Sequence, residues 1–156
     1  MRRGFGQLAL GFGLICFVVG CGGSAPPETL AVVGGTLLVD GKPLDGVTVT
    51  FIPDIAKNNR GGSGTTDING GFSVTDLTQN LTGLAPGRYT VAYSRMRLPD
   101  GSAPPVPQPD QPVNPGIICV ETLPGRLQSP DPRLPSNQVS IPEDGIVDLE
   151  LNIRTK

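Results

Sequence analysis

The chain has 156 residues, of which 22 are glycine and 17 are proline, and its formal net charge is −2. This length allows one domain with appendages, and the slightly acidic charge excludes the basic footprint of a nucleic-acid-binding protein. Histidine is absent, which excludes Ser-His-Asp and Cys-His catalysis and every zinc site that needs an imidazole. The acidic residues stand mostly where turns need them, so we predict no catalytic residue, no metal ligand and no cofactor.

The amino terminus has the features of a secretory signal. Arg2 and Arg3 precede 13 apolar or small residues, 8–20. This stretch is too short to cross a hydrocarbon layer of about 30 Å as a helix, but it has the length of a signal-peptide core. It ends at residues 18–21, Val-Val-Gly-Cys, which resemble the lipobox of bacterial lipoproteins, where cleavage occurs before the cysteine. An ordinary signal peptide cut elsewhere and a short signal anchor are the alternatives.

The lipobox resemblance implies that residues 1–20 are removed and that Cys21 becomes the first mature residue. Its sulfur then carries diacylglycerol and its amine a further acyl chain, and stable membrane anchoring needs more than one chain. Residues 21–31 form a lipidated, flexible tether, because they combine Gly and Ser with a Pro pair. We therefore expect a protein anchored in the cell envelope that faces the periplasm or the exterior. Gly22, in place of an aspartate, favours the outer membrane.

Cysteine usage agrees with this interpretation. Cys16 leaves with the signal and Cys21 is acylated, so Cys119 is the one thiol that remains free in the mature chain. A lone cysteine forms no internal disulfide, and we expect Cys119 to be buried as a small hydrophobic residue rather than to react. The mature chain keeps 10 basic and 14 acidic residues, a net charge of −4.

The chain alternates with a period of two from Val32 onward. Residues 33, 35, 37 and 39 share one face of a first strand, which ends at the Asp-Gly-Lys-Pro turn of residues 40–43. In a second strand, Val47, Val49 and Phe51 alternate with threonines up to Pro53. We expect a polar loop over residues 54–64.

The middle of the chain contains two turn signals. Asn69-Gly70 predicts a β-hairpin, because both residue types tolerate positive φ, and Phe72 and Val74 continue the strand that follows it. Residues 84–88 form a corner before Tyr89. A tyrosine in this place is similar to the tyrosine corner of sandwich folds, in which its hydroxyl binds backbone upstream.

Two further strands complete the pattern. Tyr89, Val91 and Tyr93 share one face of the strand that follows the corner. The last strand alternates most strictly, and its predicted inward-facing residues are Val147, Leu149, Leu151 and Ile153. Short alternating strands between turns are typical of a sandwich or a barrel.

Residues 96–137 interrupt this pattern, since they hold 11 of the 17 prolines. Proline cannot donate to a β ladder, so most of the segment is expected to be loop or polyproline-like, either a partly ordered excursion or a mobile segment. Its apolar residues 117–120 are a candidate short strand or a plug over the core. Around the start of this segment, Arg95 and Arg97 are expected to be solvated charges at a sheet edge rather than an anion-binding site.

Four segments in order resemble carboxypeptidase regulatory-like domains, namely residues 35–44 (GTLLVDGKPL), 46–53 (GVTVTFIP), 66–72 (TDINGGF) and 86–91 (PGRYTV). The resemblance covers residues 32–94 and extends to the closing strand, 146–153. It implies an all-β, seven-stranded Greek-key sandwich of the transthyretin type over residues 32–153, without catalytic activity. The Pro-rich insertion at 96–137, before the last strand, departs from the minimal family pattern.

These observations favour an envelope-anchored, non-catalytic lipoprotein module that binds or scaffolds an envelope protein or glycan, because loops on rigid scaffolds commonly carry recognition. The membrane is a partner through the acyl chains on Cys21, and nucleic acid is not. One alternative is a carrier of a small ligand or of calcium, since residues 67–70 superficially resemble a calcium loop, although the later bidentate acid is missing. A second is a hydrolase, for which no facing pair of carboxylates can be identified.

Overall fold

A computed structural model describes residues 29–54, 61–78, 80–106 and 116–156. The predicted signal peptide, Cys21 and most of the predicted tether lie outside the described residues. The described chain forms eleven strand segments, seven of them longer than two residues, with one short α-helix and one 3-10 turn. The fold is therefore all-β, as predicted, whereas the Greek-key order of the transthyretin type stays a prediction.

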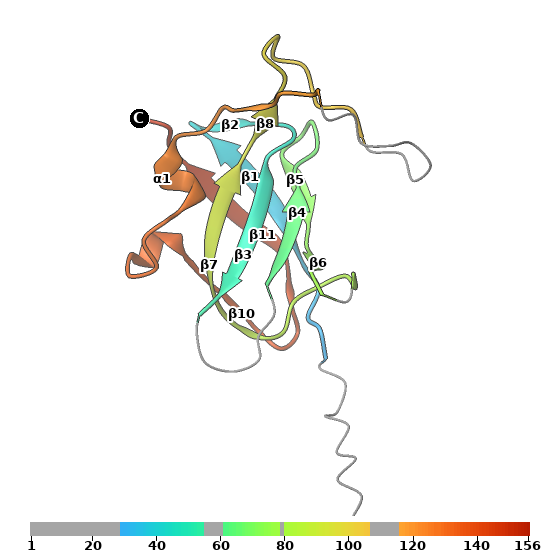
Figure 1. The fold of residues 1–156 in the computed structure, drawn as a ribbon. Coiled ribbons are helices and arrows are strands. Elements are labelled where there is room, and N and C mark those ends of the chain that lie inside the picture. Colours follow the sequence, from blue (N-terminus) through green and yellow to red (C-terminus); the bar gives the residue numbers. More distant parts are fainter. Residues whose placement is uncertain (1–28, 55–60, 79, 107–115) are drawn as a thin grey trace, which may run out of the picture.

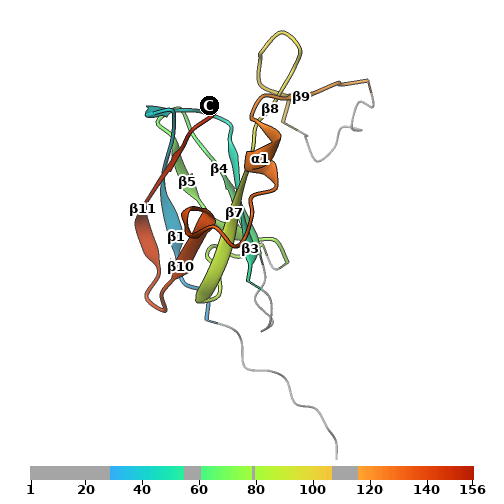
Figure 2. The same ribbon diagram turned by 90° about the vertical axis from the view of Figure 1, so that its left-hand side faces the viewer.

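Two sheets face each other and form the two layers of the sandwich (Figures 1 and 2). The members of the first sheet all pair with β1 (Val33–Val39); they are β11 (Ile146–Ile153) on one side and β2 (Lys42–Pro43) and β5 (Gly71–Ser73) on the other. The second sheet has the order β10 (Gln138–Ile141), β7 (Gly87–Ser94), β3 (Thr48–Pro53), β4 (Gly62–Thr65), β6 (Thr75–Asp76).

Smaller elements belong to the Pro-rich insertion. A two-stranded ladder joins β8 (Met96–Arg97) to β9 (Val120–Glu121) at one end of the sandwich. After it come α1 (Gly125–Gln128) and a 3-10 turn, η1 (Pro135–Asn137). Among the described residues, no helix combines the length and the apolar character that spanning a bilayer requires.

The core lies between the two sheets and confirms the alternation predicted for β3, whereas in β7 Thr90 and Ala92 are buried together with the predicted inward-facing residues. Val47, Val49 and Phe51 are fully buried, as are Tyr89 and Val91 within about 1%. The Phe51 ring lies 6.4 Å from that of Phe72 in the opposite sheet and 6.2 Å from that of Tyr89, edge to face. Burial of such aromatic side chains supplies a large part of the hydrophobic stabilisation of a small domain.

The prediction for the start of the last strand is wrong, because Val147 is 70% exposed. A register shift separates the pair Val33–Ile146 from the pair Gly35–Leu149, so β11 has one residue more than β1 in this interval. Such a bulge inverts the alternation. Ile146 therefore packs against the core in place of Val147, while Leu149, Leu151 and Ile153 face inward as predicted.

The predicted polar loop over residues 54–64 is also partly wrong, because its end is strand β4. The glycines that suggested a loop are required by close contacts. A Cβ atom at Gly62 would lie 2.4 Å from the Leu84 side chain, and one at Gly64 would lie 2.3 Å from the Ser73 carbonyl oxygen. Glycine in a strand marks such close approaches.

Both predicted turns form, but the second differs in detail. Asp40 and Gly41 take positive φ and join β1 to β2, as a two-residue hairpin requires. At the Asn-Gly pair only Gly70 has positive φ. The strand that leaves this turn is divided, since β5 pairs with β1 in the first sheet and β6 pairs with β4 in the second.

The corner before β7 forms as predicted. The Tyr89 hydroxyl donates a 2.7 Å hydrogen bond to the Ala85 carbonyl, four residues upstream. The fold begins slightly before the predicted boundary, because Ala31 is buried and exchanges two backbone hydrogen bonds with Leu84. The end of the predicted tether is therefore part of the sandwich.

Candidate binding groove

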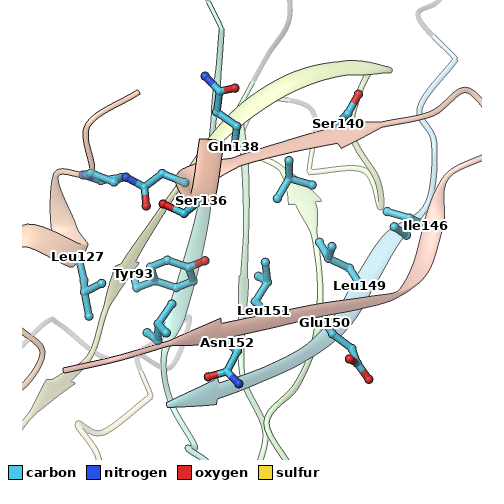
Figure 3. A pocket seen from close by; sticks show the side chains of 14 residues that line it. Tyr93, Leu127, Ser136, Gln138, Ser140, Ile146, Leu149, Glu150, Leu151 and Asn152 are labelled. Atoms are coloured by element: carbon cyan, nitrogen blue, oxygen red, sulfur yellow. The ribbon is translucent and has the colours of Figure 1, made fainter. Parts of the chain in front are cut away.

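A groove of about 470 Å³ lies between β10 and β11 (Figure 3). These two strands are consecutive in the chain but belong to different sheets, and each forms the edge of its sheet. The turn of residues 142–145 joins them. Within the described chain, β10 pairs with β7 alone and β11 pairs with β1 alone, so the groove opens between two unpaired strand edges.

The turn explains why the two sheets separate here. Gly145 has a φ of 83° and lies against Val32, where a Cβ atom would be 2.4 Å from the Val32 carbonyl oxygen. That carbonyl instead accepts the amide of Ile146 at 2.8 Å. Glycine is thus needed for both its conformation and its size. The turn that contains it leads the chain from β10 in the second sheet to β11, which pairs with β1 in the first sheet.

The floor of the groove is apolar apart from the Tyr93 hydroxyl, whereas the polar residues Ser136, Asn137, Gln138 and Ser140 of η1 and β10 also line it. Figure 3 shows Tyr93, Leu127, Leu149 and Leu151 directed into it, whereas Glu150 points away. Tyr93 is 6% exposed, and its burial raises the pKa of the phenol to about 12. No described residue hydrogen-bonds this hydroxyl, in contrast to that of Tyr89. The floor of the groove therefore offers an apolar surface with one neutral hydroxyl, beside a polar wall from η1 and β10.

The Pro-rich insertion supplies one wall of the groove. Leu123 is 7% exposed within the core, and Leu127 packs against the same cluster. Pro130 and the η1 residues Ser136 and Asn137 continue the wall toward β10. The second half of the insertion lines the groove. The plug over the core is formed by Leu123 rather than by residues 117–120, since Ile117 and Ile118 are 40% and 71% exposed.

The open edge of β11 presents free backbone groups to the groove. The Ile153 carbonyl accepts the Asp40 amide at 2.8 Å, so the backbone groups of Ile153 face β1. Backbone directions alternate along a strand that pairs in a parallel ladder. Those of Leu149 and Leu151 therefore face β1, and those of Glu150 and Asn152 face the open edge.

The same edge is acidic. Residues 142–153 contain Glu143, Asp144, Asp148 and Glu150, and no lysine or arginine. All four are exposed, and the salt bridges of the described residues involve other acids. The groove therefore has an apolar floor and an acidic rim whose carboxylates form no salt bridge among the described residues.

A second polar cluster, which we call the clamp, consists of Asp45, Arg95, Arg97 and Glu121 and fastens the base of the insertion. Arg97 is only 5% exposed; its guanidinium lies 2.6 Å from the Asp45 carboxylate and also binds the Asp45 carbonyl at 2.9 Å. Arg95 binds the other carboxylate oxygen at 2.9 Å. The expectation that these arginines are solvated edge charges is wrong, because Arg95, just after β7, and Arg97, in β8, both reach across to Asp45 in the loop before β3.

Glu121 holds the returning chain of the insertion. Its carboxylate accepts the Ser94 hydroxyl at 2.6 Å and the amides of Arg95 and Leu123 at 2.8 Å each. Burial raises the pKa of Glu121, but these hydrogen bonds outweigh burial, so its pKa lies below the ordinary value. Hydrogen bonding by Arg95, aided by both arginine charges, likewise lowers the pKa of Asp45. Hydrogen bonds and ion pairs hold the clamp side chains to one another and to neighbouring backbone and hydroxyl groups, which indicates a structural role.

The remaining sequence candidates have local explanations. Asp67 accepts the amides of Asn69 and Gly71 at 2.8 Å each, so its carboxylate stabilises the turn that resembles a calcium loop. No group of three or more acidic or cysteine side chains within the described ranges is arranged to hold a metal ion. Cys119 is free, and it is half-buried rather than buried as predicted. Cys21, the predicted lipidation site, lies outside the described residues.

Sequence reasoning did not find the groove. Tyr93 was predicted only as a strand residue, and no local motif marks an opening between two sheet edges. The one available signal was the run of residues 142–153, which contains four acids and no base and in which Asp148 and Glu150 alternate with leucines. Comparisons with protein-family models, curated proteins and solved structures found no match.

Proposed function

We propose that the chain is a non-catalytic lipoprotein module, anchored in the cell envelope through acyl chains on Cys21, that binds or scaffolds an envelope protein or glycan. One observation carries this proposal. The described chain enters the sandwich at Thr29, at the end opposite to the β8–β9 ladder and the loop that it supports (Figure 1). An anchor that precedes Thr29 would therefore attach at the end of the sandwich opposite to the β8–β9 ladder.

The distance between the two ends follows from strand length. Strand β7 has eight residues, which at about 3.3 Å each correspond to about 26 Å. The clamp fixes the insertion at the far end of this scaffold. Loops presented in this way on a rigid sandwich are well placed for recognition, and the absence of histidine in the chain supports binding rather than catalysis.

The proposal includes the domain family. The tyrosine corner, the Asp40-Gly41 turn and the late closing strand support a carboxypeptidase regulatory-like domain with transthyretin-like Greek-key order. Such domains accompany other envelope or surface proteins as stabilising or adhesive modules. The Pro-rich insertion is the part of this chain that the family resemblance does not cover.

Labelling and capture test the two halves of the proposal. Cells that express the full chain are labelled with palmitate; we expect labelled protein for the wild type and none for Cys21→Ala. Label that persists in Cys21→Ala contradicts anchoring at this residue. The intact lipoprotein is then used to capture envelope proteins and glycans, alongside a variant in which Asn-Gly replaces residues 99–118.

This deletion keeps residues 120–137, because Leu123 belongs to the core and Leu127 to the groove. We expect the variant to remain folded and to lose at least part of the captured material. If neither the wild type nor the variant enriches any envelope component, the binding function is wrong.

A further inference from the structure

We infer that the groove between β10 and β11 binds an extended polypeptide segment in which apolar residues alternate with lysine or arginine, added as a new strand on the free edge of β11. The inference goes beyond the proposed function, because it assigns a class of partner to a groove that lies apart from the loop between β8 and β9. Three properties of the groove lead to it: free backbone groups, an apolar floor and an acidic rim.

The backbone groups determine the form of the partner. The amides and carbonyls of Glu150 and Asn152 face the open edge, as derived from the ladder between β1 and β11. An extended chain is the ligand that satisfies such groups at the regular spacing of a strand. A compact ligand of the same volume would satisfy at most one or two of them.

The floor determines every second side chain of the partner. In an added strand, residues on the inner face would lie beside Leu149 and Leu151 and above Tyr93 (Figure 3). Apolar side chains suit this surface, since they remove it from water. The Tyr93 hydroxyl, which is directed into the groove and has no partner among the described residues, can bind a backbone carbonyl or amide of the same segment.

The rim determines the other side chains. Residues on the outer face of the added strand would lie beside Asp148 and Glu150, with Glu143 and Asp144 at the end of the groove. Opposite charges on neighbouring strands stabilise pairing, and like charges oppose it. Lysine or arginine at alternate positions is therefore favoured, and an acidic segment is disfavoured.

The test uses the full chain in non-ionic detergent and a fluorescein-labelled peptide of alternating Lys and Val, seven residues long. We expect saturable anisotropy with a dissociation constant below about 1 mM. A block peptide of the same composition, with four Lys before three Val, should bind at least about fivefold more weakly, and a Glu-Val peptide should not bind. Equal binding of the alternating and block peptides would overturn the inference, because it indicates charge attraction without strand pairing.

Variants separate the three contributions. Glu150→Pro removes an amide that faces the open edge and leaves the ladder with β1 intact, since proline is tolerated on edge strands; we expect binding to be lost. Asp148→Asn combined with Glu150→Gln should weaken binding about fivefold, and Tyr93→Phe about threefold. Asp100→Asn, an exposed acid in the loop between β8 and β9, is the matched control and should bind as the wild type does. Unchanged affinity in both the charge variant and Tyr93→Phe contradicts the inference even if Glu150→Pro fails to fold.

Hydrogen exchange gives a direct readout of the added strand. In the wild type, exchange of the Glu150 and Asn152 amides should slow at least about tenfold when the peptide is added. Unchanged exchange despite saturable binding shows a different mode and overturns the inference. So does protection of these amides without peptide in a dimer, because the occupant is then a second copy. If the peptide does not bind but envelope capture persists, the groove is wrong and the proposed function stands; if the peptide binds and nothing is captured, the proposed function fails by itself.

Discussion

Strand β7 and the insertion that follows it are held in place in different ways. Strand β7 lies between β3 and β10 and is hydrogen-bonded along both edges, while its side chains fill the core. The insertion has a ladder of two residue pairs, and a few side chains fix it: Arg97 and Glu121 at its base and Leu123 beyond. A segment rich in proline cannot rely on backbone pairing, so its position depends on individual side chains. The comparison predicts that single changes in the insertion can cost nearly as much as changes in the sandwich.

The largest loss of stability is expected for a substitution in the core of the sandwich. Phe51→Ala should lower the free energy of unfolding by about 3–5 kcal/mol, because the ring is fully buried between Phe72 and Tyr89. Ile68→Ala, at a residue that is 82% exposed, should change it by less than about 0.5 kcal/mol. Urea unfolding measures both values, and similar values would show that Phe51 is not the centre of the core.

Leu123 tests whether the insertion shares that core. Leu123→Ala should cost about 2–4 kcal/mol, since the side chain is 7% exposed in the main cluster. Ile118→Ala lies a few residues earlier in the same insertion, is 71% exposed, and should cost less than about 0.5 kcal/mol. Equal small effects would mean that the insertion is not packed on the sandwich.

The two tyrosines of β7 provide a matched pair. Tyr89→Phe removes the hydrogen bond to the Ala85 carbonyl and should destabilise the fold by about 1 kcal/mol. Tyr93→Phe removes a hydroxyl that lacks a described partner, and its effect on stability should be close to zero. Thermal unfolding of both variants measures the two effects. A larger loss of stability in Tyr93→Phe than in Tyr89→Phe would contradict the stabilising role of the tyrosine corner.

The clamp should produce a smaller effect that depends on pH. The pKa values of Asp45 and Glu121 are lowered in the fold from 3.8 and 4.5, so both carboxylates stabilise the fold fully above these values. That contribution is lost as the pH falls through the lowered pKa values. Denaturation between pH 5 and 2 should show a steeper loss of stability in the wild type than in Asp45→Asn combined with Glu121→Gln. Parallel curves would show that the clamp does not contribute.

Much of the sandwich could be predicted because inward-facing residues follow the strand pleat. Val49 and Phe51 are buried and alternate with less buried neighbours in β3, and the tyrosine corner follows from a local motif. Val147 could not be placed correctly, since a bulge depends on the pairing of β11 with a strand more than 100 residues away. Strand β4 was missed because its glycines serve contacts with Leu84 and Ser73, which local sequence does not reveal. The groove arises from two unpaired edges, and the burial of Arg97 depends on Asp45, 52 residues away.

The anchoring of the sandwich through Cys21 is the claim on which the proposed location in the cell envelope depends. Intact-mass and peptide mass spectrometry of the protein isolated from native envelopes tests it most directly. We expect the mature chain to begin at Cys21, with diacylglycerol on the sulfur and an acyl chain on the amine. A chain that begins elsewhere, or an unmodified Cys21, would contradict it.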